Sequence, residues 1–216
     1  MKESLKPYPL EDRLMAEMLK TARKNWNDWQ TVFEHGVPID NNPLLADERK
    51  FRSFLREYSV NRTIGEGKHD EFRRELQNSL SFKEAIDDDS GVSLDTLEPH
   101  LRRRFGSKQG KNRLISVLSK VAAFVRPERF VAWDRFARRG LNIVLGRGVS
   151  SPFDTYCDYL KDFDTAWNGQ WGQGIKHYMV RNTERALETE PRFQRRVFDV
   201  YLMKCGGRWS RKRRGT

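Results

Sequence analysis

A single carboxylate stands inside the most basic part of this sequence. Asp134 lies in the stretch Leu101–Arg139, which carries twelve Lys or Arg side chains and only two acidic ones, for a local charge of +10. Basic clusters attract polyanions and a carboxylate repels them, so an acid here requires an explanation. Such a carboxylate can stabilise a developing cation or activate a water molecule. Two simpler interpretations stay open, in which Asp134 caps a helix or pairs with Arg138 four residues later.

The residues around Asp134 predict an ordered series of elements. From Gly106 to Leu141 the chain reads GSKQGKNRLISVLSKVAAFVRPERFVAWDRFARRGL. A basic loop that contains glycine leads into a strongly apolar helix, and the backbone N–H groups at a helix start favour a phosphate. Pro127 ends that helix, and Asp134 begins the next one.

This order of elements resembles the helix-hairpin-helix DNA glycosylases, a superfamily with endonuclease III, adenine-mismatch and alkyladenine branches. In that family a hairpin containing glycine grips the DNA backbone, and an aspartate at the start of the next helix performs the chemistry. The matching aspartate is Asp134. Residues 201–209, YLMKCGGRW, are similar to the family's late helix that ends in a Gly-Arg run. The hairpin departs from the usual Leu-Pro-Gly-Val-Gly, because Gly106–Gly110 reads GSKQG.

The resemblance implies a base-flipping enzyme with Asp134 as its catalytic carboxylate. The expected DNA-binding residues are Lys108, Gly110, Lys111, Arg113, Arg138 and Arg139. Base flipping also requires an aromatic pocket or wedge, for which the candidates are Trp133, Tyr58, Trp167 and Trp171. For these four aromatic residues, packing in the core is the alternative interpretation.

Members of the family with lyase activity carry a lysine 18 or 19 residues before the aspartate. Those positions hold Ser116 and Ile115 here, so the resemblance implies a monofunctional glycosylase that leaves an abasic site. A bacterial enzyme that removes modified bases from phage DNA is one form of this hypothesis. Two alternatives come from other classes: a non-catalytic nucleic-acid-binding protein, and a component of a defence system that acts on RNA.

The composition bounds the partners and cofactors. The net charge is +11, and the tail Arg208–Thr216 holds five of the basic residues and no acidic one. This charge favours double-stranded DNA as the partner. Only Cys157 and Cys205 are present and the four histidines are scattered, so we expect no metal site and no cofactor. No apolar run reaches the roughly 18 residues of a membrane span, and no signal peptide is evident. A cytoplasmic monomer without a membrane partner is the expectation.

Helical periodicity dominates the chain, and the predicted fold class is an all-α, multi-helix bundle similar to a glycosylase. We expect one globular domain over 1–207 and a basic tail over 208–216. Two helical lobes around a DNA-binding groove, divided near 91–106, are the alternative. The helices are expected over 10–33, 43–58, 72–80, 94–105, 113–125, 136–145, 152–167 and 191–205, with a break over 168–174. The helix over 113–125 is apolar on nearly all sides, which predicts a buried central position.

Overall fold

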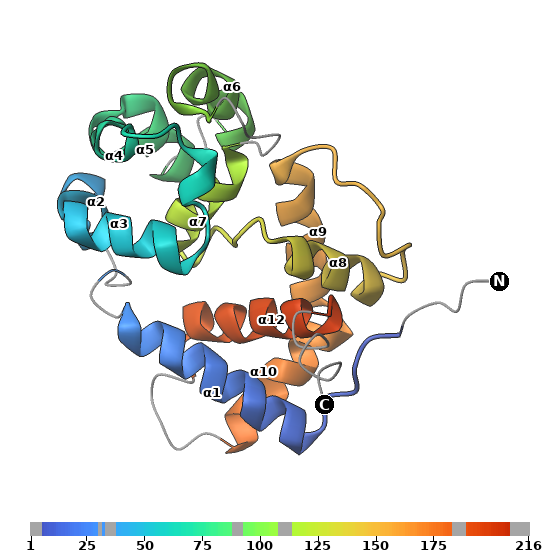
Figure 1. The fold of residues 1–216 in the computed structure, drawn as a ribbon. Helices are drawn as coiled ribbons and strands as arrows, with labels where there is room; N and C mark the ends of the chain where they lie inside the picture. The colour runs from blue at the N-terminus through green and yellow to red at the C-terminus, as the bar shows by residue number, and fades with distance from the viewer. Residues whose placement is uncertain are drawn as a thin grey trace, which may run out of the picture. The chain divides into compact units, whose positions relative to one another are not determined.

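The computed structural model describes residues 6–29, 32, 38–87, 93–107, 114–182 and 189–207. Within these ranges the chain forms eleven α-helices and two short 3-10 helices, and it contains no β-strand (Figure 1). The all-α prediction is therefore confirmed. In the same ranges the β-type pairing is one isolated bridge, between Ile64 and Gly106.

The helices belong to two compact units. The first consists of Met1–Asp28 and Trp133–Thr216, and the second is the uninterrupted segment Trp29–Ala132. The range 91–106, where the sequence suggests a lobe boundary, lies inside the second unit. There, helix α6 (Leu94–Phe105) packs against the helices that precede and follow it in the chain. The residues expected to do chemistry are thus divided, because Asp134 belongs to the first unit and the basic loop to the second.

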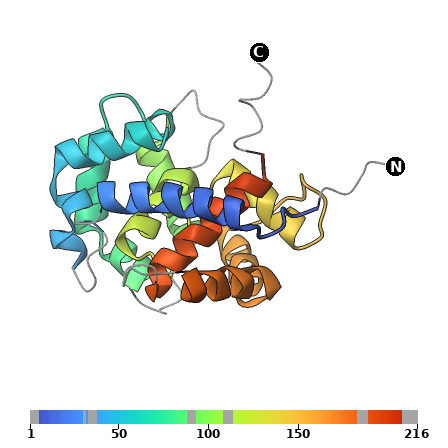
Figure 2. The same cartoon turned by 90° about the horizontal axis from the view of Figure 1, so that it is seen from below.

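Helix α12 (Pro191–Cys205) is the centre of the first unit. Ten of its fifteen residues are buried. It packs against α8 (Arg135–Val144), α1 (Asp12–Asp28) and α10 (Gln170–Asn182), and Figure 2 shows α1 in blue beside the red α12. Helix α9 (Tyr156–Asn168) packs against α8 and α10.

Two glycines let the backbones of α8 and α12 touch. A Cβ atom at Gly140 of α8 would overlap the carbonyl oxygen of Leu202, and one at Gly206 would overlap that of Phe136. Glycine is the residue that permits such an approach, since it has no Cβ. The contact fixes the start of α8, and therefore Asp134, against α12.

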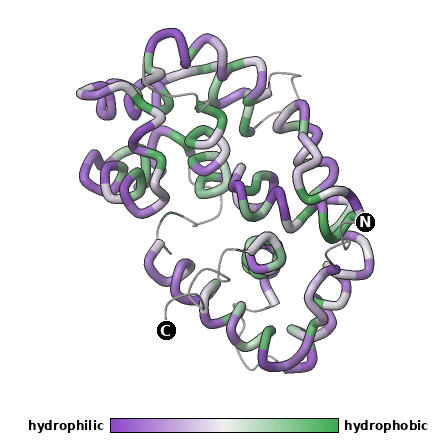
Figure 3. The backbone as a smooth tube through the Cα atoms, turned by 45° about the vertical axis from the view of Figure 1, so that its right-hand side comes forward, coloured by the Kyte–Doolittle hydropathy of each residue, from purple (hydrophilic) through white to green (hydrophobic). Residues whose placement is uncertain are grey.

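Helix α7 (Ile115–Val125) is the buried helix of the second unit, as its sequence predicts. Nine of its eleven residues are buried, and it packs against α6. Its Phe124 meets the rings of Trp29, Phe54 and Tyr58 at centroid distances of 5.5, 5.0 and 4.9 Å. The other elements of this unit are η2 (Ile39–Asn41), α2 (Pro43–Ala46), α3 (Glu48–Glu57), η3 (Asn61–Thr63), α4 (His69–Asn78) and α5 (Leu80–Asp87). Figure 3 shows hydrophobic and hydrophilic residues alternating along the helices, as amphipathic helices on a core require.

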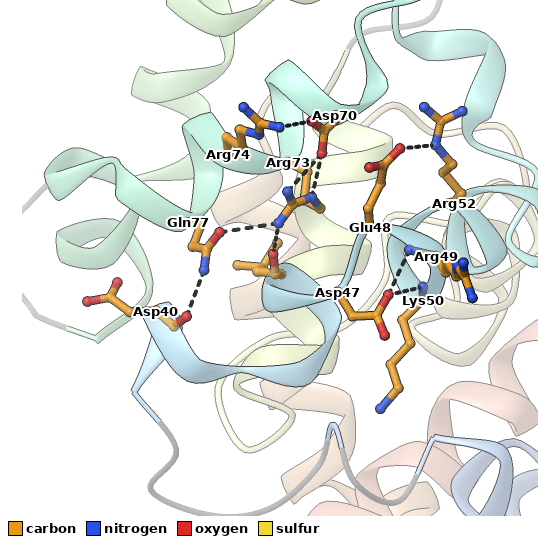
Figure 4. A network of polar contacts seen from close by, with 11 residues as sticks. Asp40, Asp47, Glu48, Arg49, Lys50, Arg52, Asp70, Arg73, Arg74 and Gln77 are labelled. Carbon is orange, nitrogen blue, oxygen red and sulfur yellow. Dashed lines mark hydrogen bonds and ion pairs between the residues drawn. The ribbon is translucent and has the colours of Figure 1, made fainter.

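A buried arginine ties α4 to α2. Arg73 is 7% exposed, and its guanidinium donates to the carbonyl oxygen of Leu45 in α2. Figure 4 shows Arg73 between Asp70 and Gln77. It also donates to Asp70 Oδ1 at 2.9 Å and to Gln77 Oε1 at 3.2 Å. Gln77 in turn donates to the Asp40 carbonyl oxygen at 2.8 Å. The buried charge is compensated at each of these contacts, as a charge in a protein interior must be.

Side-chain caps explain two differences from the expected helices. The helix expected over 43–58 is two helices, because the Asp47 side chain accepts from the N–H of Arg49 and starts α3 afresh. The helix expected over 152–167 begins later, at α9, because Thr155 caps it. Polar side chains that bond to nearby N–H groups favour such starts over helix interiors.

A serine divides the helix expected over 72–80. Helix α4 ends at Asn78, and Ser79 lies between it and α5. The Ser79 Oγ accepts from the N–H of Phe82 at 3.2 Å, which satisfies one free donor at the new start. Leu80, expected in the apolar stripe, is 68% exposed as a result.

The break expected over 168–174 is wrong. Only Gly169 interrupts the helices, and α10 begins at the next residue. A Cβ at Gly172 would overlap the carbonyl oxygen of Trp167, so this glycine lets the first turn of α10 lie against the end of α9. Glycine here serves close packing, whereas the sequence suggests a flexible segment.

The Gly140→Ala variant tests the contact between α8 and α12. Helix propensity alone would raise the free energy of unfolding by about 1 kcal/mol. We expect it to fall by about 3 kcal/mol, because the new methyl group forces the two backbones apart. Urea denaturation measures the change.

Gly148→Ala is the matched control. Gly148 is exposed, and an added Cβ would meet only the Ser151 Oγ at 3.3 Å. We expect a change within about 0.5 kcal/mol. Equal stability of the two variants would contradict the backbone contact.

Candidate functional site

Asp134 is the N-cap of α8. Its Oδ1 accepts hydrogen bonds from the N–H of Phe136 at 2.8 Å and of Ala137 at 3.4 Å. Its backbone is extended, with φ −105° and ψ 141°, as a residue before a helix should be. Its Oδ2 makes no hydrogen bond or ion pair to any residue that the structure describes. The half-buried carboxylate is therefore anchored by one oxygen and open at the other.

Arg138 stacks on Trp133 and does not pair with Asp134. The guanidinium carbon lies 4.4 Å from the centroid of the Trp133 ring. The Nε atom is buried without a hydrogen-bond partner. Burial lowers the pKa of the Arg138 guanidinium, while Tyr159 and Asp134 act in the opposite direction. The alternative in which Asp134 pairs with Arg138 is thus not what the structure shows.

Trp133 is held in an aromatic cluster. Its ring lies edge-on to Phe153, Tyr156 and Tyr159 at centroid distances of 6.3, 6.0 and 5.4 Å. Tyr156 and Tyr159 are fully or almost fully buried. Burial, and next the charge of Asp199, raises the pKa of Tyr159 well above its usual value, so its hydroxyl stays neutral. Aromatic contacts of this kind hold the indole in one position.

Sequence reasoning missed a buried acid whose charge acts on Tyr159 of this cluster. Asp199 of α12 is 2% exposed and forms an ion pair with Arg196. The available signal was an acidic residue between the apolar Phe198 and Val200, with an arginine three positions earlier. That pattern predicts a buried ion pair.

Most of the expected DNA-binding residues lie outside the described residues. These are Lys108, Gly110, Lys111 and Arg113, and the basic tail over 208–216 lies outside them too. The described residues on either side of this gap are Ser107, two residues after α6, and Leu114, directly before α7. Arg138 and Arg139 are described, and both are half-buried on α8. The exposed Arg135, on the first turn of the same helix, joins them as a further cation.

A carboxylate occupies the helix start expected to bind phosphate. Glu98 of α6 is 6% exposed, and its Oε1 accepts from the Leu114 N–H at 2.9 Å. The Arg102 Nε lies 3.8 Å from the same oxygen. The N–H groups at a helix start are those that bind phosphates. The Leu114 N–H is already used, which corrects the expectation at that position.

The other candidate aromatic residues pack within their units. Tyr58 belongs to the cluster around Phe124 in the second unit. In the first unit, Trp167 packs against Phe198 at 5.5 Å and Trp171 stacks on Tyr201 at 5.9 Å. Trp167 is 7% exposed, and the Lys176 ammonium lies over its ring at 4.1 Å. Of the four, Trp133 is the one next to Asp134.

Two further features bear on ligands. A shallow polar pocket of about 220 Å³ in the second unit is lined by Glu71, Arg74, Glu75, Asn78, Ser79 and Arg104. Within it, Arg104 forms ion pairs with Glu71 at 2.8 Å and with Glu75 at 2.6 Å. These three side chains therefore already compensate one another's charge. Among the described residues, no three His, Cys, Asp or Glu side chains are grouped so that they could hold a metal ion.

Comparisons with family models, with curated proteins and with solved structures each found no match for this chain. None of the helices that the structure describes has the length and apolar character needed to cross a membrane.

The cap at α8 makes a prediction for stability. Asp134→Ala should lower the free energy of unfolding by about 1 kcal/mol, because two N–H groups lose their acceptor. Asp134→Asn should stay within about 0.5 kcal/mol of the parent chain, since asparagine caps as well as aspartate. Chemical denaturation of both variants checks this. If Asp134→Ala were as stable as the parent, the capping bonds would contribute nothing.

Proposed function

We propose that this chain is a monofunctional DNA N-glycosylase that flips a damaged or modified base out of double-stranded DNA and cuts its bond to the sugar. The resemblance over Gly106–Leu141 supports this proposal. The structural observation on which it depends is the geometry of the Asp134 carboxylate. Two backbone N–H groups anchor one oxygen of Asp134, and the other oxygen has no partner among the described residues. Such a carboxylate is oriented before a substrate arrives, which electrostatic stabilisation of a transition state requires.

The chemistry needs one carboxylate and one water. Breaking the bond between C1′ and the base nitrogen leaves positive charge on the sugar, as in glycoside hydrolysis. The Asp134 Oδ2 stabilises that charge and accepts a proton from the water that adds to C1′. The base departs with the electrons of the broken bond and takes up a proton. The products are a free base and an abasic site, and no cofactor takes part.

The absence of a lyase lysine supports the monofunctional form. Ser116 and Ile115 stand at the positions where lyase members carry that lysine. The nearby Lys120 is 8% exposed, and its Nζ lies 3.4 Å from the Tyr58 carbonyl oxygen. Lys120 stands at neither of those two positions, and its ammonium donates to a backbone carbonyl oxygen.

A non-catalytic nucleic-acid-binding protein is the second candidate. The capping bonds of Asp134 favour it, since they account for the carboxylate without any reaction. In that case the arginines of α8 hold the nucleic acid by charge alone. The two candidates differ in whether Asp134 is needed for a chemical product.

Asp134→Asn separates the candidates, because asparagine keeps the cap and removes the charge. We expect it to abolish the formation of alkali-labile sites, with a loss of at least about 100-fold. DNA affinity should stay equal or rise, since a carboxylate that repels phosphates is gone. The assay incubates the chain with duplexes containing uracil, 8-oxoguanine, alkylated, mismatched or hydroxymethylated bases, followed by alkali and a denaturing gel.

Asp47→Asn is the matched control. Asp47 caps α3 with the same geometry, at 2.7 Å from the Arg49 nitrogen and 3.1 Å from the Lys50 nitrogen. We expect this variant to keep full activity. Cleavage without alkali would point to a lyase or nuclease, and DNA binding without any product would favour the second candidate. Cleavage of RNA substrates alone would replace DNA by RNA as the target.

A further inference from the structure

Arg138 is a half-buried cation without an anionic partner in the described part of the first unit. Among the described residues it has no ion-pair partner within 4 Å, although Asp134 lies four residues earlier, at the usual spacing for a helical pair. Its Nε is buried and has no acceptor. Burying a charge costs free energy unless an opposite charge or hydrogen bonds compensate it. An unpaired group of this kind in a native structure calls for a ligand or water as its missing partner.

The Arg138 guanidinium lies over the ring of Trp133. Its carbon lies 4.4 Å from the ring centroid, and the ring itself is held by Phe153, Tyr156 and Tyr159. A guanidinium that lies over an aromatic face can still pair its two terminal nitrogens with two oxygens of a phosphate. The face of Trp133 that Arg138 covers is not available for stacking on a base.

Asp134 and Arg138 are kept apart by these contacts. The carboxylate turns to the N–H groups of Phe136 and Ala137, while the guanidinium turns to Trp133. A salt bridge between the two would neutralise both groups. Because each has its own contacts, binding of an anion to Arg138 requires no salt bridge with Asp134 to be broken.

From these contacts we propose that the stacked pair of Arg138 and Trp133 binds a phosphodiester group of a nucleic acid beside Asp134. In this arrangement Trp133 is the support for the guanidinium and not the surface for an extruded base. The nucleic-acid partner rests on the proposed function.

A polymer with several phosphates fits this surface better than a single phosphate ion. Arg135 and Arg139 lie within one turn of Arg138 on α8, and neither forms an ion pair with a described residue. One phosphate ion satisfies one guanidinium, whereas a nucleic-acid backbone offers regularly spaced charges to all three.

The test compares two lysine substitutions that keep the charge. Arg138→Lys should weaken binding of a 20-base-pair duplex about 10-fold, because an ammonium does not reproduce the stacked, two-pronged geometry. Arg139→Lys, the control, should weaken it by less than about 3-fold, since no aromatic ring supports Arg139. Fluorescence anisotropy at several salt concentrations measures both, and the slope of log K against log[salt] should be unchanged for the lysine variants and about 0.9 smaller for Arg138→Gln.

Substitutions at Trp133 test whether the two residues act together. Trp133→Leu should weaken binding as much as Arg138→Lys, and the double variant should be no weaker than either alone. Trp133→Phe keeps an aromatic face and should bind within about 3-fold of the parent chain. Thermal denaturation shows whether Trp133→Leu is folded, and Trp133→Phe and Arg138→Lys decide the outcome if it is not.

The proposal is overturned if Arg138→Lys binds like Arg139→Lys, or if the Trp133 and Arg138 effects add. It is also overturned if inorganic phosphate, added at constant ionic strength, displaces the duplex at low millimolar concentration, since the site would then select free phosphate. These outcomes are separate from the proposed glycosylase. If Arg138→Lys weakens binding but the parent chain forms no abasic product on any duplex, the proposed enzyme is wrong and the phosphate site stands. If the parent chain forms an abasic product but Arg138→Lys binds as the control does, the enzyme stands and the phosphate site is wrong.

Discussion

The first unit depends on the place where the backbones of α8 and α12 touch. No side chain separates the two helices at Gly140 and Gly206, so their positions are set by peptide groups in van der Waals contact. Peptide groups have no alternative rotamers, and a contact between them is therefore stiffer than one between side chains. Asp134 lies less than two turns from Gly140 along α8. The position of the carboxylate is therefore set by this close backbone contact.

This rigidity reconciles two roles for Asp134. A cap needs one carboxylate oxygen, and a reaction needs another in a defined place. The hydrogen bonds to Phe136 and Ala137 use Oδ1 alone, and the Arg138 guanidinium lies over Trp133 without pairing with Asp134. Trp133 packs against Tyr159 of α9, and α8 itself is fixed against α12 at Gly140. The residues around Asp134 therefore draw on three helices of the first unit.

Periodicity was enough to predict the all-α fold, the buried helix α7 and the helix that Asp134 begins. The sequence predictions were wrong where the same residue type can have two structural roles. Glycine at position 172 suggested a break but serves close packing, and Asp47 looked like a residue inside a helix but starts one. The bond between Glu98 and the Leu114 N–H, like the two-unit division, joins residues that no local pattern relates. Such contacts depend on how helices pack, which side-chain periodicity does not determine.

The first unit consists of two segments that are far apart in the chain, Met1–Asp28 and Trp133–Thr216. This separation affects how the unit folds during synthesis. Its closing contacts join distant residues: the Tyr201 hydroxyl donates to the Tyr8 carbonyl oxygen at 2.7 Å, and Lys204 Nζ lies 3.1 Å from Glu17. The second unit is one continuous segment and can fold as it leaves the ribosome. Helix α1 must wait for α12, on the order of ten seconds at usual rates of translation. Through that interval its apolar face, with Met15, Met18 and Trp26, lacks its final neighbour α12 and is open to chaperones.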